Sequence, residues 1–159
     1  MIIVADSSPL ISFAILNKLS ILDQIFDDIY IPRAVYEELT KKNKPHAQKL
    51  KEFAQTRVKQ IQNRLAVQFL QKELDMGESE AIVLAIENNI IDILIDEYKG
   101  RQIAQSQGLL PIGTIGVLLQ AKKMGLIRKV KPELDELVAN HRRISHQLYD
   151  KALELASEE

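Results

Sequence analysis

The chain begins with a short apolar run, Ile2–Ala5, that ends abruptly at the carboxylate of Asp6. Such β-branched runs without polar alternation are typical of parallel strands buried on both faces. Ser7 or Ser8 can cap a following helix, and Pro9 suits its first turn because a missing N–H costs nothing there. The order strand, acid, helix predicts an α/β fold in which Asp6 lies at the carboxyl end of a sheet, where such folds bind ligands. The simpler alternative is that Asp6 belongs only to the helix cap.

The rest of the chain repeats this alternation of strands and helices. We expect strands at 29–31, 90–95 and 108–113, with a short edge strand at 58–61. The spacing of apolar residues predicts helices at 19–26, 33–40, 46–55, 64–74, 78–89, 115–124, 133–140 and 145–156, and a helix that contains Ile103 and Ala104 follows Arg101. The alternation indicates a three-layer α/β/α sandwich around a short parallel sheet. A single domain should span 1–159, with 132–159 as a C-terminal helical extension because that part is helical only.

The composition narrows the class of function. There is no cysteine and there are three scattered histidines, which disfavours a disulfide framework, a thiolate site and a zinc site. A formal charge of −1 does not indicate a generally basic nucleic-acid binder, although it can conceal a local basic patch. The sequence has no Gly-rich phosphate loop and no nucleophile elbow. It also has neither a signal peptide nor a long apolar run, so we expect a cytoplasmic protein that does not cross a membrane.

Three further carboxylates occupy positions comparable to that of Asp6. Glu38 borders the buried face of its helix, although a solvated helix charge is the alternative. Glu78 begins a helix that is apolar around most of its circumference and lies on the buried side, whereas Glu80 sits about 160° away. Acids in a first turn also suit the helix dipole, which is the structural explanation of Glu78. Asp96 follows the second long apolar strand.

Carboxylates gathered at one edge of a sheet would repel one another strongly unless a cation neutralised them. Hard divalent ions with a preference for oxygen ligands, Mg²⁺ or Mn²⁺, suit such a cluster. One or two of these ions can activate water and stabilise the leaving oxygen in phosphodiester hydrolysis. The sequence therefore predicts a carboxylate metal site and hydrolytic chemistry on a phosphodiester.

Four motifs together resemble the PIN domain family, and they are distributed over nearly the whole chain. They are IVADSSPLI at 3–11, IPRAVYEEL at 31–39, GESEAI at 77–82 and LIDEYKGR at 94–101. GESEAI together with GTIGVL at 113–118 more narrowly resembles a prokaryotic branch related to the VapC-type toxins of toxin–antitoxin pairs. The resemblance implies an α/β/α sandwich and a Mg²⁺- or Mn²⁺-dependent endoribonuclease.

The resemblance also implies the residues of the site. The acids of the family, which are catalytic and bind metal, map onto Asp6, Glu38, Glu78 and Asp96. The third acid is usually aspartate, so Glu78 lengthens that ligand by one methylene, and Glu80 is the second choice there. A slip of one residue along the strand would make Glu97 the fourth acid in place of Asp96.

Polar and basic residues near these motifs are candidates for contacts with nucleic acid. They are Ser8, Lys99, Arg101, Arg142 and Arg143, since guanidinium groups in particular match phosphate oxygens. The simpler interpretation of 141–143 is a solvated basic loop. The expected partners are RNA, a second copy of the chain in a homodimer and an antitoxin-type protein. The alternative function is a catalytically weak or inactive PIN-like module that binds RNA or a protein partner.

Overall fold

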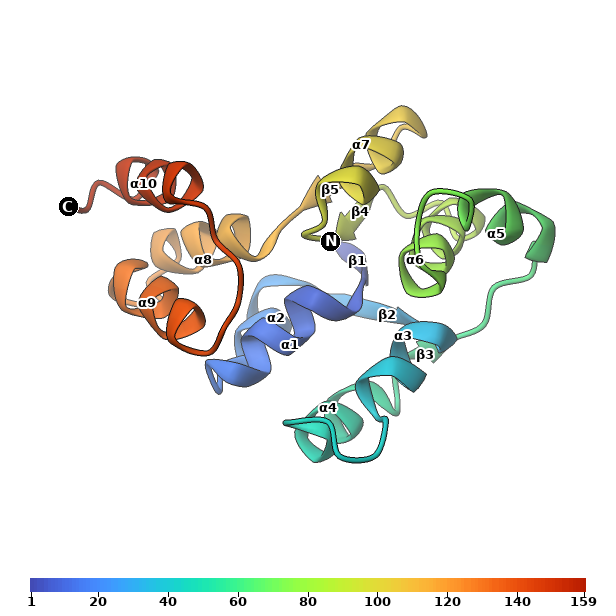
Figure 1. The fold of residues 1–159 in the computed structure, drawn as a ribbon, viewed down its shortest axis with the longest axis horizontal. Helices are drawn as coiled ribbons and strands as arrows, with labels where there is room; N and C mark the ends of the chain where they lie inside the picture. Colours follow the sequence, from blue (N-terminus) through green and yellow to red (C-terminus); the bar gives the residue numbers. More distant parts are fainter.

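The computed structural model describes residues 1–159 and contains one parallel sheet of five strands (Figure 1). The strands are β1 (Ile2–Ala5), β2 (Asp28–Pro32), β3 (Val58–Lys59), β4 (Asp92–Leu94) and β5 (Leu110–Ile112). Their order across the sheet is β3-β2-β1-β4-β5, and every neighbouring pair is parallel. The chain therefore runs outward from β1 to one edge and then returns to continue beside β1 on the other side. The carboxyl ends of β1 and β4 form the point of reversal, where open α/β sheets bind ligands.

Ten helices surround the sheet, and each of the four strand connections contains one or two of them. The helices are α1 (Ser7–Ile15), α2 (Leu19–Ile25), α3 (Arg33–Leu39), α4 (Ala47–Ala54), α5 (Arg64–Leu70), α6 (Met76–Glu87), α7 (Tyr98–Ser106), α8 (Thr114–Lys123), α9 (Lys131–Ala139) and α10 (His146–Leu155). None of them combines the length and apolar character that crossing a bilayer requires. The predicted α/β/α sandwich is confirmed.

Successive residues of β1 face two different hydrophobic cores, as the period of a strand requires. Ile3 and Ala5 belong to a core of 26 buried residues, which also receives side chains from α1 to α4 and α8 to α10. Val4 belongs to a second core of 14 buried residues, formed with α5, α6 and α7. The sheet thus separates two apolar layers, and Asp6 follows where the central strand leaves both of them.

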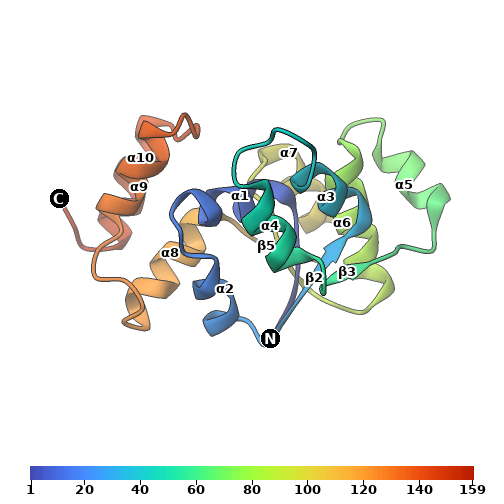
Figure 2. The same cartoon turned by 90° about the horizontal axis from the view of Figure 1, so that it is seen from below.

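The C-terminal helices pack on the larger core. Leu134 and Leu137 of α9 and Ala152 and Leu153 of α10 are buried in it, and Figure 2 shows α8, α9 and α10 grouped at one end of the molecule. The last turn is also held by a carboxylate: Glu158 accepts hydrogen bonds from Lys122 Nζ at 2.9 Å and from the backbone of α9.

Element boundaries differ from the sequence prediction mainly at the ends. The strand expected at 90–95 shortens to Asp92–Leu94, because the chain enters the sheet only after Ile91, whose side chain is exposed. The helix expected at 64–74 ends at Leu70, and the following turns lead to Asp75, which caps α6. These shifts leave the order of elements unchanged.

Candidate active site

Asp6 lies at the point of reversal of the sheet and carries a buried, uncompensated carboxylate. Its N–H donates to the carbonyl oxygen of Leu94 at 2.9 Å, which fixes the residue between β1 and β4. Asp6 is 4% exposed, forms no ion pair, and makes no side-chain capping bond although it occupies the N-cap position of α1. Burial raises its pKa well above the usual range, and neighbouring acids add to the effect although the backbone N–H of Ser7 opposes it. Helix capping therefore does not account for this side chain.

Glu38 approaches Asp6 across a glycine. A Cβ atom at Gly77 would lie 3.4 Å from Asp6 Oδ1 and 3.5 Å from Glu38 Oε2. The missing side chain at the start of α6 therefore allows the two carboxylates to flank the same stretch of backbone. Glu38 is half-buried on α3 while Glu37 is exposed, as the helical spacing predicts.

Glu78 is buried at the start of α6 and takes part in a capping box. Asp75 Oδ1 accepts the N–H of Glu78 at 2.7 Å, and Glu78 Oε1 accepts the N–H of Asp75 at 3.0 Å. Burial is the largest cause of the raised pKa of Glu78, and the charges of Asp75 and Glu97 contribute. Its Oε2 lies 3.5 Å from the Cβ position of Gly100, so capping explains only one of the two oxygens. Asp75 was not among the predicted site residues, although the D-x-x-E spacing of a capping box could have indicated it.

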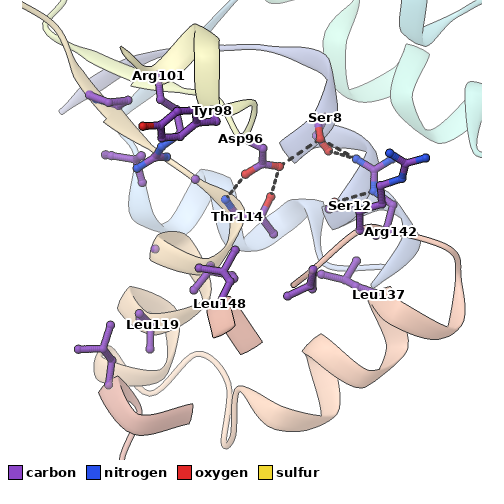
Figure 3. A pocket seen from close by; sticks show the side chains of 18 of the residues that line it. Ser8, Ser12, Asp96, Tyr98, Arg101, Thr114, Leu119, Leu137, Arg142 and Leu148 are labelled. Atoms are coloured by element: carbon purple, nitrogen blue, oxygen red, sulfur yellow. Dashed lines mark hydrogen bonds between the residues drawn. The ribbon is translucent and has the colours of Figure 1, made fainter. Parts of the chain in front are cut away.

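The carboxylate of Asp96 is directed to other partners. It accepts hydrogen bonds from Ser8 Oγ at 3.1 Å, from the N–H of Thr114 at 2.7 Å and from Thr114 Oγ1 at 2.7 Å (Figure 3). Glu97, the second choice for the fourth acid, is exposed at the N-terminus of α7 and raises the pKa of Glu78. The structure thus groups Asp6 and Glu78 with Glu38 around the start of α6, and it places Asp96 between α1 and α8.

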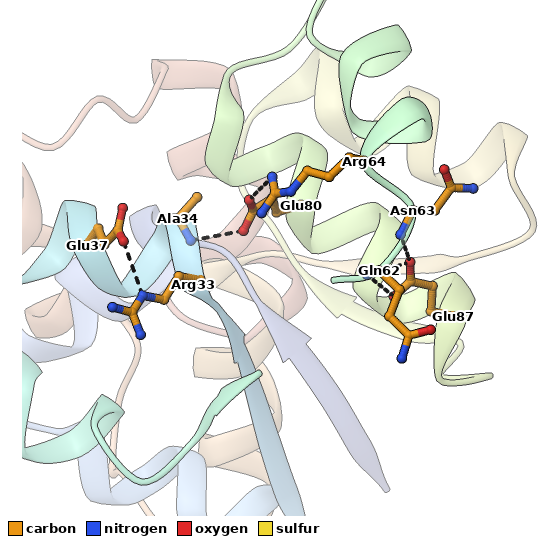
Figure 4. Close-up of polar contacts among 8 residues, drawn as sticks. All are labelled: Arg33, Ala34, Glu37, Gln62, Asn63, Arg64, Glu80 and Glu87. Atoms are coloured by element: carbon orange, nitrogen blue, oxygen red, sulfur yellow. Dashed lines mark hydrogen bonds and ion pairs between the residues drawn. The ribbon is translucent and has the colours of Figure 1, made fainter. Parts of the chain in front are cut away.

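Glu80 lies on a different side of α6 and does not join this group. Its carboxylate accepts the N–H of Ala34 at 2.9 Å and pairs with Arg64 Nη1 at 2.7 Å (Figure 4). The prediction that Glu80 lies away from the buried side of the helix is wrong, since the residue is only 2% exposed. Both α3 and α5 contact α6, so the helix is buried on both flanks. Glu80 therefore ties three helices together.

The predicted phosphate-binding residues also differ in their partners. Arg142 Nη2 donates to Ser8 Oγ at 2.7 Å and to the Ser8 carbonyl oxygen at 3.0 Å, and its Nε donates to Ser12 Oγ at 3.2 Å. The interpretation of 141–143 as only a solvated loop is therefore wrong for Arg142. Arg101 Nη1 donates to the carbonyl oxygen of Ile95 at 3.1 Å. Lys99 instead pairs with Glu73, an exposed acid in the connection between α5 and α6.

The donor set around Asp6 suits a hard divalent cation in its chemistry. It consists of carboxylate oxygens. The carboxylate of Asp6 at its centre is buried, and no lysine or arginine neutralises that charge. However, no three Asp, Glu or His side chains converge closely enough to hold one ion. The residues fit such an ion by charge and ligand type, and binding it would require side chains to turn toward Asp6.

Fold and site together define a parallel α/β/α protein with an acidic centre at the point of reversal of its sheet. A family model described as a PIN domain matches residues 2–158, and the chain therefore belongs to the PIN domain family. PIN domains are generally metal-dependent nucleases, so membership indicates a protein that acts on nucleic acid. No curated protein and no solved structure gives a significant match to the chain.

Proposed function

We propose that the protein is a metal-dependent endoribonuclease that hydrolyses phosphodiester bonds of RNA with Mg²⁺ or Mn²⁺. The observation that carries the proposal is the buried Asp6 carboxylate, which has acidic neighbours and no cationic partner. A protein gains nothing in stability from such an arrangement, whereas a cation-dependent enzyme requires it. Membership of the PIN domain family supports the same chemistry.

In this proposal Asp6, Glu38 and Glu78 hold the ion, directly or through water. The ion supplies activation of the attacking water and stabilisation of the leaving oxygen. The fourth acid is Asp96, which keeps Ser8 and Thr114 in place by accepting hydrogen bonds from their hydroxyl groups. Glu97 is the alternative, because its charge contributes to the raised pKa of Glu78. Either way, no lysine or arginine forms an ion pair with Asp6, Glu38 or Glu78, so the positive charge is left to the ion.

Substrate phosphates are proposed to bind beside this centre, at Ser8 and the arginines. Arg142 keeps its Nη1 without a protein partner while its other nitrogens hold α1. Arg101 likewise has donors to spare beyond the one bound to Ile95. Guanidinium groups positioned in this way can orient a phosphate without blocking the acids.

The test combines RNA cleavage with thermal unfolding in chelator, Mg²⁺ and Mn²⁺. We expect metal to raise the free energy of unfolding of the unaltered protein, by about 2.7 kcal/mol at a hundredfold excess over Kd. Asp6→Asn and Glu38→Gln should lose both this increase and cleavage. Glu37→Gln is the matched control, because that carboxylate is exposed on the same helix. A metal response equal in Asp6→Asn and the unaltered protein would contradict the assignment.

The second candidate is a catalytically weak or inactive PIN-like module that binds RNA or a protein partner. The observation that favours it is that no three acids converge to hold an ion. RNA binding without cleavage and without a metal response would support this candidate over the nuclease.

The resemblance to VapC-type toxins extends the main proposal to a homodimeric cytoplasmic toxin with an antitoxin-type partner. Growth arrest on induction, lost in Asp6→Asn, would support the toxin role.

A further inference from the structure

A cavity of about 990 Å³ lies beside the acidic centre, between the carboxyl-end loops of the sheet and the C-terminal helices. Its two ends differ in character, as Figure 3 shows. Ser8, Asp96, Thr114 and Arg142 meet at one end through hydrogen bonds. The other end is lined by Leu119 of α8 and by Leu148 and Leu155 of α10, while Leu137 of α9 lies beside Arg142. The cavity therefore has a polar end next to the site and an apolar, partly exposed end away from it.

The charged residues around this cavity are mostly arginines that form no ion pair. It is lined by Arg101, Arg142 and Arg143, and by a single carboxylate, Asp96. None of these arginines forms an ion pair with an acid of the protein. The oxygens of Asp96 are already occupied by hydroxyl and N–H donors. The unbalanced charge at the polar end is thus positive and suits an anion.

We propose that this cavity receives one nucleobase of the RNA chain, with the adjoining phosphate on Arg142 and Arg143. The inference rests on the proposed ribonuclease function and assigns it a base-binding subsite. A nucleotide joins a flat apolar ring to an anion, and the cavity joins an apolar end to a cationic end. The cavity includes Ser8, two residues after Asp6, and Asp96, the proposed fourth acid, so a nucleotide bound in it would lie beside the acidic centre.

The C-terminal extension is what creates this subsite. Arg142, Arg143 and Ile144 come from the connection between α9 and α10, and Leu148 from α10 itself. Because Arg142 is bonded to Ser8 and Ser12 of α1, the connection is held against the sheet domain. A base in the cavity would therefore be positioned relative to the acids by the same contacts that hold the extension.

The test measures RNA binding in the Asp6→Asn background, where cleavage does not interfere. Leu148→Glu places a carboxylate in the apolar end, and Leu65→Glu adds the same charge on α5, far along the chain. The two leucines are 48% and 63% exposed, so neither substitution disrupts a core. We expect Leu148→Glu to bind single-stranded RNA containing 2-aminopurine about tenfold more weakly than Leu65→Glu does. The change in 2-aminopurine fluorescence on binding should also be smaller with Leu148→Glu than with Leu65→Glu. RNA with an abasic site at that position should bind both variants equally.

Equal affinity of the two variants for the base-containing RNA would overturn the subsite. Tight binding of free adenosine monophosphate, equal to that of the RNA, would also overturn it, since the cavity would then be a site for small nucleotides. Arg143→Gln, at an exposed position, is the second variant and should weaken binding of both RNAs. Metal-dependent cleavage by the unaltered protein is scored separately. If the unaltered protein does not cleave RNA but Leu148→Glu still loses affinity only for the base-containing RNA, the proposed nuclease activity is overturned and the base-binding subsite is supported.

Discussion

At the scale of single residues, Asp6 shows how a position can be unfavourable for stability and suited to function. The backbone of β1 and its bond to Leu94 fix the residue, while burial and the nearby acids oppose its charge. Perturbed carboxylates of this kind are concentrated at functional sites. Glu78 differs, because one of its oxygens stabilises the start of α6. The same acidic group therefore contains one side chain with a structural role and one without.

Asp6→Asn should stabilise the metal-free protein at neutral pH, by about 0.5–2 kcal/mol. Folding raises the pKa of Asp6, so stability falls as the pH rises from the usual value of 3.8 toward the raised value. The asparagine side chain does not ionise, so the variant is free of this loss of stability. Its higher free energy of unfolding should disappear below pH 3.8, where the carboxyl group of Asp6 is protonated in both the folded and the unfolded state. Urea unfolding across pH in chelator measures the difference. Asp150→Asn, at an exposed position, is the control, and a lower stability of Asp6→Asn at pH 7 would contradict the argument.

At the scale of elements, α6 carries two glutamates with different tasks. Glu78 faces the acids at the start of the helix, and Glu80 faces α3 and α5. The sequence predicts the helix and the buried side of Glu78, because the apolar residues that follow show 3.6-residue periodicity. The burial of Glu80 depends on helices that arrive from elsewhere in the chain. Periodicity within one helix cannot report neighbours on both of its flanks.

The two glutamates should respond in opposite ways to substitution. Glu80→Ala leaves the Ala34 N–H and Arg64 without an acceptor, and should lower the free energy of unfolding by about 1–3 kcal/mol while the response to Mn²⁺ remains. Glu78→Gln keeps an acceptor for the Asp75 N–H and should lose the response to Mn²⁺ with little change in stability. Denaturant unfolding with and without Mn²⁺ separates the two effects. Loss of the metal response in Glu80→Ala would move the site to that side of the helix.

At the scale of the whole molecule, the C-terminal extension is joined to the first helix and to α8. Arg142 reaches Ser8 across 134 positions of sequence, a contact that no local pattern could indicate. The sequence did predict that 141–143 is basic and that the last helices are amphipathic. It could not predict where they pack, because an apolar stripe fits the sheet domain or a second copy equally well. The strand at Ile2–Ala5 and its acid were predictable, since a buried strand needs a continuous apolar run.

Glu158 should contribute to the attachment of this extension in a pH-dependent way. Burial alone would raise its pKa, but Lys122 and the N–H groups of Val130 and Lys131 outweigh burial and lower the pKa to about 2. Its stabilisation is therefore present above pH 4.5 and lost as the pH falls toward about 2. Glu158→Gln should cost about 1–2 kcal/mol at pH 7, with the difference vanishing at low pH. Thermal unfolding of Glu158→Gln beside Glu159→Gln tests this, and equal stabilities at pH 7 would contradict it.

The central position of β1 in the sheet also affects how the protein is made. Of the five strands of the sheet, β1 is translated first, yet one of its two neighbours, β4, follows only after three strands and six helices. Contacts between residues so distant in sequence form slowly, and the apolar strand remains exposed to solvent until they form. Asp6 is fixed by β4, so the acidic centre cannot exist in a short nascent chain. Synthesis of the protein therefore proceeds through a long stage in which the chain already carries its first acid but has no site.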